Sequence, residues 1–236
     1  DRSSSWADFI NGSLGVLFIT WIARWYERQL SLIEKCSCLS FLLCSTLIVV
    51  WPLYKQYVNT QIRLTRFPVL ADFEDPSDIT FWIAEQGDHT ERHPSDKSTI
   101  VRILPGVDES HHLKVELGRG RWSGVSFYPP IANWEKYRLL SFSLCRHPST
   151  IRLAIRVDDN QETLHTSDRF NRLLPEPEES AAGCQLIEIP VDDIRRGPKV
   201  RLLDVAEVKR IVIFSANQKQ DPDQSNWFTV DNVLLK

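Results

Sequence analysis

The feature that most constrains this chain is an uncharged stretch of nineteen residues at positions 36–54. It reads CSCLSFLLCSTLIVVWPLY and is closed by Lys35 on one side and Lys55 on the other. A helix of this length is nearly as long as the hydrocarbon core of a bilayer is thick, which is roughly 30 Å. Helices buried in the core of a soluble protein are seldom so long and so free of charge. The stretch therefore predicts a membrane-spanning helix that divides the chain between two solvents.

A shorter apolar stretch precedes it at residues 9–23 and ends in Arg24, Trp25 and Tyr26. A cation that reaches the interface and two interfacial aromatic rings help a short helix to span. We therefore predict a two-helix transmembrane hairpin within residues 1–58. The alternative, a signal-like or amphipathic segment, is disfavoured because the opening DRSSSWAD has neither a basic start nor a small-residue cleavage site.

The chain contains no methionine, so we expect it to be a piece of a longer protein whose upstream region is missing. Its basic residues do not decide the membrane orientation, because three of them lie between the two apolar stretches and three lie soon after the second. A short basic loop is retained in the cytoplasm more readily than a long polar domain. We therefore expect a multi-pass protein of the inner (cytoplasmic) membrane, with its C-terminal domain in the periplasm or outside the cell.

Beyond residue 60 the chain is polar and slightly acidic, and neither part of the chain has the basic excess of a nucleic-acid binder. Apolar and polar residues alternate there, with Pro, Gly, Asn and Asp in the gaps. This pattern predicts a mainly β fold, an antiparallel jelly-roll β-sandwich over residues 70–236 that follows a linker at 59–69. Short helical turns are expected at VDDIRR and LLDVAEV. The predicted strands are 70–75, 79–85, 98–104, 111–117, 123–129, 139–146, 151–159, 184–191, 208–216 and 227–235.

The first part of the chain carries a short motif, RSSSWADFINGSLG. Residues 1–55 resemble the end of a VanZ-like membrane domain, in which an Arg, a small polar run, an Asp and an Asn precede a Gly-containing helix. The resemblance implies a polar site between helices for Asp8 and Asn11, with capping of the helix start as the alternative. The matching residues are Arg2, Ser4, Asp8, Asn11, Gly12 and Gly15.

The polar part opens on Phe73-Glu74-Asp75 and closes on a strand that carries Asp231-Asn232-Val233. In these landmarks residues 70–236 resemble the galactose-binding-like jelly rolls, which include carbohydrate-binding modules and the complex I intermediate-associated protein 30 domain. Related jelly rolls often hold a structural calcium ion where the first and last strands meet. The resemblance places such an ion at Glu74 and Asp231, with Asp75 or Asp72 as helpers, whereas pairing with Arg or Lys is the alternative.

Sugar recognition requires flat aromatic faces beside planar polar groups, because pyranose rings present C–H faces as well as hydroxyls. The candidate ligand-binding residues are Trp122, Tyr128, Trp134, Asp168 and Arg169. Asp168 and Arg169 lie in the predicted loop at 165–172, and the two tryptophans lie among polar neighbours. For each aromatic residue taken singly, packing in the core is the alternative.

Two cysteines, Cys145 and Cys184, fall in the predicted sandwich, and three fall in the apolar stretch. In a periplasmic domain the pair could form a disulfide, but the sequence does not show whether their α-carbons approach, so free buried thiols are the alternative. The histidines lack the spacing of a zinc site.

Catalytic signatures are absent from the sequence. It has no Gly-rich phosphate loop and no G-x-S-x-G elbow, and the pair Asp158-Asp159 would face opposite sides of a strand. We therefore predict a membrane-anchored non-catalytic protein that binds carbohydrate, an envelope or imported glycan. The alternative is a domain that docks other membrane proteins and does not bind sugar.

Overall fold

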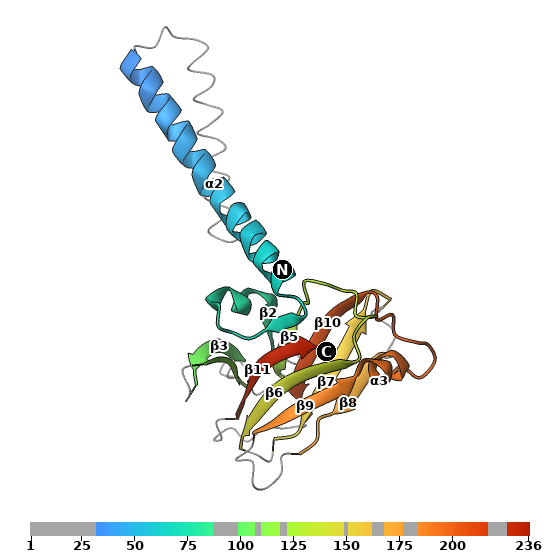
Figure 1. The fold of residues 1–236 in the computed structure, drawn as a ribbon. Coiled ribbons are helices and arrows are strands. Elements are labelled where there is room, and N and C mark those ends of the chain that lie inside the picture. The colour runs from blue at the N-terminus through green and yellow to red at the C-terminus, as the bar shows by residue number, and fades with distance from the viewer. Residues whose placement is uncertain are drawn as a thin grey trace. The chain divides into compact units, whose positions relative to one another are not determined.

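The computed structural model describes residues 32–86, 99–106, 110–118, 122–148, 151–161, 168–176, 184–216 and 226–236 (Figure 1). The predicted helix at 9–23 and the VanZ-like motif lie outside the described residues. The chain divides into two compact units, Asp1–Gln61 and Ile62–Lys236.

Helix α2 (Leu32–Arg66) contains the whole of the uncharged stretch. Large apolar side chains are exposed along its middle, among them Leu47, Ile48, Trp51 and Leu53. Within the described part of the chain, no helix was found that combines the length and the apolar character needed to cross a bilayer. The transmembrane hairpin therefore stays a prediction.

The segment expected to be a linker, 59–69, is mostly helical, because α2 continues through it to Arg66. The sequence NTQIRLTR has no proline or glycine that would end the helix earlier, whereas Pro68, two residues after Arg66, cannot continue it. Residues 62–66 belong to the second unit, so the sandwich begins with the last turn of this helix.

The second unit is built from two antiparallel sheets (Figure 1). The six-stranded sheet contains, in order, β3 (Ile100–Pro105), β4 (His111–Glu116), β11 (Trp227–Leu235), β6 (Leu139–His147) and β9 (Cys184–Pro190), with β1 (Val69–Ala71) also paired to β11. The five-stranded sheet contains β2 (Trp82–Glu85), β5 (Gly124–Phe127), β10 (Val208–Ser215), β7 (Leu153–Asp159) and β8 (Phe170–Leu173). The predicted mainly β, antiparallel sandwich is confirmed.

The first and last strands lie together, as the sequence landmarks suggested. β11 pairs with β4 through its first half and with β1 through Val233 and Leu234. Asn232, which has a φ of 51°, lies in the irregular segment between these two pairings. A left-handed residue of this kind bends the strand and lets it change partners, and asparagine tolerates the conformation better than most residues.

The predicted strand boundaries differ most from those in the structure near the start of the sandwich. β1 ends at Ala71, and the chain turns at Phe73, which has a φ of 59°. The 3-10 helix η1 (Pro76–Phe81) then replaces the first part of the strand expected at 79–85. The Asp75 carboxylate accepts a hydrogen bond from the Ser77 amide at 2.8 Å, and Pro76 fixes the backbone of the first turn, so local capping overrides the alternating pattern here.

The core lies between the sheets and takes alternate residues from each strand. In β7, the side chains of Leu153, Ile155 and Val157 are fully buried against residues of the other sheet, such as Phe142 and Phe228. Complete burial of one such side chain contributes roughly 1.5–3 kcal/mol. Because strand side chains alternate, the residues between them lie on the opposite face of the five-stranded sheet.

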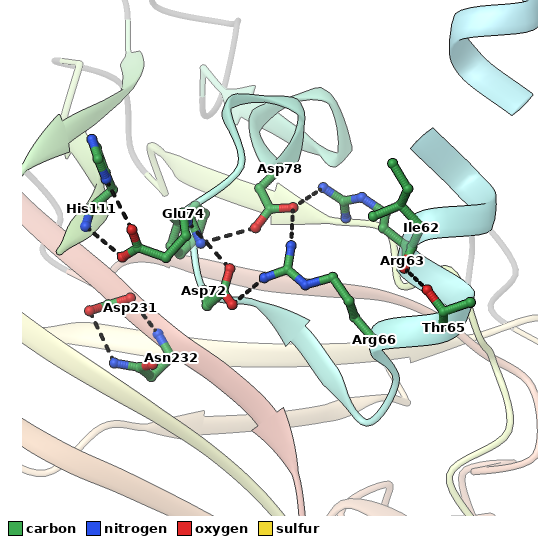
Figure 2. A network of polar contacts seen from close by, with 11 residues as sticks. Ile62, Arg63, Thr65, Arg66, Asp72, Glu74, Asp78, His111, Asp231 and Asn232 are labelled. Carbon is green, nitrogen blue, oxygen red and sulfur yellow. Dashed lines mark hydrogen bonds and ion pairs between the residues drawn. The ribbon is translucent and has the colours of Figure 1, made fainter. Parts of the chain in front are cut away.

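A buried ion pair joins the end of α2 to the start of the sandwich (Figure 2). Arg63 Nη2 lies 2.9 Å from Asp78 Oδ1, and the other carboxylate oxygen accepts a hydrogen bond from the Phe73 amide at 2.9 Å. The guanidinium of Arg63 also lies over the Phe81 ring, 3.5 Å from its centroid. Burial raises the pKa of Asp78, and the charge of Arg63 opposes that rise.

We expect Asp78→Ala to lower the free energy of unfolding by about 3–5 kcal/mol, because it leaves the Arg63 charge buried without its partner. Asp72→Ala is the matched control, since it removes a carboxylate from the partly exposed pair with Arg66 and should cost about 1 kcal/mol or less. Denaturant unfolding followed by tryptophan fluorescence measures both. Equal losses in the two variants would contradict this account of the pair.

Candidate functional site

The side of the five-stranded sheet that faces away from the core carries charged and polar groups. We call this surface the polar face. Pairing across β2, β5, β10, β7 and β8 places its members on one side of the sheet. The polar residues of this face are Glu85, Ser126, Arg156, Asp158, Asn171 and Arg210, with Ile83 and Leu173 at its two edges. The same side of the sheet also carries a small buried apolar cluster of Ala154, Val212 and Phe214.

Asp158 is the centre of the polar face. Its Oδ2 atom accepts hydrogen bonds from Arg156 Nε at 3.1 Å and from Arg210 Nε and Nη2 at 2.9 and 2.7 Å. The Asp158 side chain is 0% exposed, whereas those of Arg156 and Arg210 are 22% and 20% exposed. The carboxylate therefore holds two guanidinium groups from neighbouring strands, and it is the guanidinium groups that reach solvent.

The network extends from Arg210 toward the opposite edge of the sheet. Arg210 Nη1 lies 3.7 Å from Glu85 Oε1, and the Ser126 hydroxyl donates a hydrogen bond to the same carboxylate. Polar contacts thus connect β7, β10, β5 and β2 across the sheet. Such a connected set of groups is ordered before any ligand arrives, which lowers the entropic cost of binding.

Two of the predicted ligand-binding aromatics lie next to β5. Trp122 is 53% exposed and lies two residues before this strand, and the Ser215 amide donates to the carbonyl of the intervening Ser123 at 2.9 Å. Tyr128 is half-buried and follows the strand. Alternation from Ser126 places Tyr128 on the polar-face side of the sheet.

Arg169 stands one residue before β8, most of which falls in the loop that the sequence predicted at 165–172. β7 and β8 pair Val157 with Phe170. Continuing this register by one residue sets Arg169 opposite Asp158. The structure therefore brings Trp122, Tyr128 and Arg169 to positions that border or belong to the polar face.

The other two predicted residues lie elsewhere. Trp134 is 0% exposed within the core, and its Nε1 donates to the Ile131 carbonyl at 3.2 Å. Its ring therefore has no free face for a sugar. The Asp168 carboxylate accepts hydrogen bonds from the Lys199 and Val200 amides, so it fixes the loop after α3 (Val191–Arg196) rather than facing the polar network.

Sequence reasoning did not name Arg156, Asp158 and Arg210 among the candidate site residues. The available signal was the alternation in β7, where two polar side chains alternate with Ile155 and Val157. Asp158 was considered only as half of a catalytic pair. Arg210 is 52 residues away along the chain, and nothing in the local sequence indicates that the two meet.

Asp159 faces away from Asp158, as strand geometry requires. It accepts hydrogen bonds from Arg201 Nη2 and from the Asp204 amide, both at 2.8 Å. Burial alone would raise the pKa of Asp159, but these bonds and the Arg201 charge outweigh burial and lower it. The pair ties the loop that follows α3 to the end of β7.

The predicted calcium ligands bond to different neighbours (Figure 2). Glu74 accepts hydrogen bonds from the His111 amide at 2.8 Å and lies 3.2 Å from His111 Nδ1. The Asp231 carboxylate accepts from the amide of Asn232 at 2.7 Å. Burial raises the pKa of Asp231 and is opposed by that bond, while the negative charges of Glu74 and Asp72 add to the rise. Over the described residues no group of three or more His, Cys, Asp or Glu side chains is arranged to hold a metal ion, so calcium stays a prediction.

Cys145 and Cys184 form a disulfide between directly opposed residues of β6 and β9. The bond fastens β9, the last strand of its sheet, to the strand beside it. Cys36 and Cys44 of α2 are free and exposed.

Comparison with known proteins identifies the fold. No family model and no curated protein matches the chain. The structure resembles the family 11 carbohydrate-binding module of the cellulosomal cellulase Lic26A-Cel5E of Clostridium thermocellum, with 21% identity, 71% of this chain and 92% of that chain covered, and a TM-score of 0.51. It also resembles a family 11 module from the same organism in complex with a β-1,3-1,4-mixed-linked tetrasaccharide, with 21% identity, coverage of 71% and 93%, and a TM-score of 0.48. The sandwich therefore has the jelly-roll fold of carbohydrate-binding modules, and the VanZ-like resemblance stays a prediction.

Acid should weaken the attachment of the loop after α3. The pKa of Asp159 lies below its ordinary value of 3.8, so its contribution to stability is complete above that value and is lost as the pH falls through the lower pKa of the folded state. We expect Asp159→Asn to cost about 1–3 kcal/mol at pH 7 and to lose less stability than wild type on acidification below about pH 4.

Urea unfolding at pH 7 and pH 3 measures this difference. Asp192→Asn, which alters an exposed pair on α3, should follow the wild type at both values of pH. If Asp159→Asn matched the wild type at pH 7 and lost as much stability in acid, the pairing with Arg201 would not stabilise the fold.

Proposed function

We propose that this chain is a membrane-anchored, non-catalytic protein whose jelly-roll domain binds carbohydrate through the polar face. The observation that carries the proposal is the polar face itself. Two guanidinium groups are ordered by Asp158 on one side of the sheet, and an exposed tryptophan, Trp122, lies two residues before β5. A solved structure that shares the fold, with a TM-score of 0.51, is a carbohydrate-binding module, which supports the proposal of sugar binding.

The chemistry of the polar face suits a sugar chain. Arg156, Arg210 and Asn171 supply planar hydrogen-bond donors, and hydroxyl oxygens accept from such groups. Trp122 offers a ring against which the C–H face of a pyranose can pack. Ile83 and Leu173 are exposed at opposite edges of the sheet, so an extended ligand that crosses the strands would cover apolar surface at both ends.

The carboxylates support binding rather than hydrolysis. Glycoside hydrolysis requires two carboxylates that flank one bond. Asp158 is fully buried beneath two arginines, and Asp159 points to the opposite side, toward Arg201. Among the described residues of the polar face, the remaining carboxylate is that of Glu85, which accepts a hydrogen bond from Ser126.

Two observations support an extracytoplasmic location for the sandwich and a membrane anchor for the protein. Disulfides persist in oxidising compartments, and Cys145 is bonded to Cys184. Helix α2 contains the uncharged stretch at 36–54 and exposes its apolar side chains. Both fit a multi-pass protein of the inner membrane with its C-terminal domain in the periplasm or outside the cell, where envelope or imported glycans are within reach.

Affinity electrophoresis against a panel of soluble polysaccharides tests the proposal. We expect at least one glycan to retard the protein, and we expect Trp122→Ala to weaken that retardation about tenfold or more, because stacking on the exposed ring is lost. Trp227→Phe is the matched control, since Trp227 lies in β11 of the other sheet, stacked on His147.

Retardation that is unchanged in Trp122→Ala would contradict the assignment of the site. A protein that no glycan retards would contradict sugar binding itself and favour the alternative, a domain that docks other membrane proteins.

A further inference from the structure

We infer that the disulfide between Cys145 and Cys184 regulates the polar face, and that its reduction by a dithiol weakens glycan binding. The inference rests on the proposed function, because it names a regulation of the same site. It follows from the contacts that join the start of β9, where the disulfide lies, to the end of β8, which forms one edge of the polar face.

The disulfide lies where the pairing of β6 with β9 ends. Cys145 and Cys184 are opposed at that end, and Cys184 is the first residue of β9. Within the described sheet β9 is the edge strand and pairs with β6. The end of a strand that is paired along one side opens more readily than a strand in the middle of a sheet. The disulfide prevents this opening.

The residue that follows each cysteine bonds the same carbonyl oxygen. Arg146 Nη2 and Gln185 Nε2 donate to the Pro175 carbonyl at 2.6 and 2.7 Å. Pro175 lies two residues after β8, an edge strand of the five-stranded sheet. The two hydrogen bonds therefore fasten the end of β8 to the two strands that the disulfide joins.

The burial of Arg146 makes this contact sensitive to the strands around it. Its side chain is buried, and its Nε and Nη1 atoms have no hydrogen-bond partner among the described residues. Burial lowers the pKa of Arg146, and the negative charge of Glu176 opposes that change. A buried charge with so few partners is favoured to turn toward water once the strands that enclose it can move. Release of β9 would therefore break the contact of Arg146 with Pro175.

The end of β8 carries part of the polar face. Asn171 and Leu173 project from this strand, and Leu173 is 49% exposed. The Leu174 amide donates to the Leu153 carbonyl at 2.9 Å, which extends the pairing with β7 up to the residue before Pro175. Movement of Pro175 would loosen this last bond and disorder the edge of the polar face. A glycan would then have to order that edge again when it binds, at a cost in affinity.

The exposure of the two cysteines sets the order of the reduction. Cys184 is exposed, whereas Cys145 is partly buried. A thiolate of the dithiol attacks Cys184 Sγ, forms a mixed disulfide with it and releases Cys145 as a thiolate. The second thiolate of the reductant then displaces Cys184, and the reductant leaves as its own disulfide. Two electrons pass to the protein, and the two cysteines take up two protons.

Amide hydrogen exchange tests the connection between the disulfide and β8. The full chain in detergent micelles is compared before and after reduction with dithiothreitol, to which Cys36 and Cys44 are already free thiols. Reduction should speed exchange in the segment that contains Leu173 and Leu174 about tenfold or more, because the end of β8 opens more often. Exchange in β3 and β4, at the opposite edge of the other sheet, should be unchanged.

Affinity electrophoresis of the same two forms against the panel of soluble polysaccharides tests the effect on binding. A glycan that retards the oxidised protein should bind the reduced protein about fivefold or more weakly, which is a typical size for coupling between two sites. The double variant Cys145→Ser and Cys184→Ser should bind like the reduced wild type, with or without dithiothreitol.

Two single variants test the route through Pro175. Gln185→Ala removes one donor to the Pro175 carbonyl and leaves the disulfide intact, so it should weaken binding by the oxidised protein in part and reduce the effect of dithiothreitol. Glu188→Gln is the matched control, since it alters an exposed pair with Lys236 on the same strand and should behave like the wild type. Circular dichroism shows whether each variant is folded.

The failures are distinguishable. Equal glycan affinity in the two redox forms, or exchange in β8 that does not respond to reduction, would overturn the inference and leave the proposed function standing. An effect of reduction that is undiminished in Gln185→Ala would also overturn it, since the coupling would not pass through Pro175. Retardation by no glycan in either form would overturn the proposed function and this regulation together.

Discussion

The pairing of β7 with β10 is the constraint on which the functional interpretation depends. Its register sets Asp158 opposite Arg210 and Arg156 opposite Val212, while Ile155 and Val157 point into the core. Side chains alternate along a strand, so a shift of the pairing by one residue would turn Arg156 and Asp158 into the core and expose Ile155 and Val157. The apolar residues of these strands thereby fix where the polar residues lie. The polar face is ordered because the core beneath it permits a single register.

Buried ion pairs recur in this sandwich, and each joins parts of the chain that are distant in sequence. Arg63 and Asp78 join the last turn of α2 to η1, and Arg201 and Asp159 join the loop after α3 to the end of β7. Asp158 and Arg210 do the same between two strands. Asp78 and Asp159 are each bonded by an arginine and by a backbone amide, whereas Asp158 is bonded by Arg156 and Arg210, and such partners offset the cost of burying a charge. The Arg63–Asp78 and Arg201–Asp159 pairs each hold a connecting segment against the sandwich. The Asp158–Arg210 pair instead orders a guanidinium group that is partly exposed to solvent.

Much of the fold was predictable because alternation is a strong signal in strands such as β10 and β11. The start of the sandwich was not, since the Asp75 cap and Pro76 override a strand-like pattern locally. Trp134 looked accessible among polar neighbours, yet its amide donates to the Val205 carbonyl at 2.8 Å and the loop buries its ring. The disulfide could not be decided either, because the sequence does not reveal that β6 and β9 are neighbours. The candidate site could not be predicted for the same reason, because its residues come from five strands that meet only in the folded sheet.

Hydroxyl-radical footprinting with and without a bound oligosaccharide tests the central claim most directly, since it reports the solvent exposure of individual side chains. The account predicts that ligand protects Trp122, Ile83 and Leu173, which are about half exposed in the free protein. Leu186, which is 60% exposed on β9 of the other sheet, should react unchanged. Protection of Leu186 and Trp227 with Trp122 unaffected would contradict the account and move the binding site to the opposite sheet.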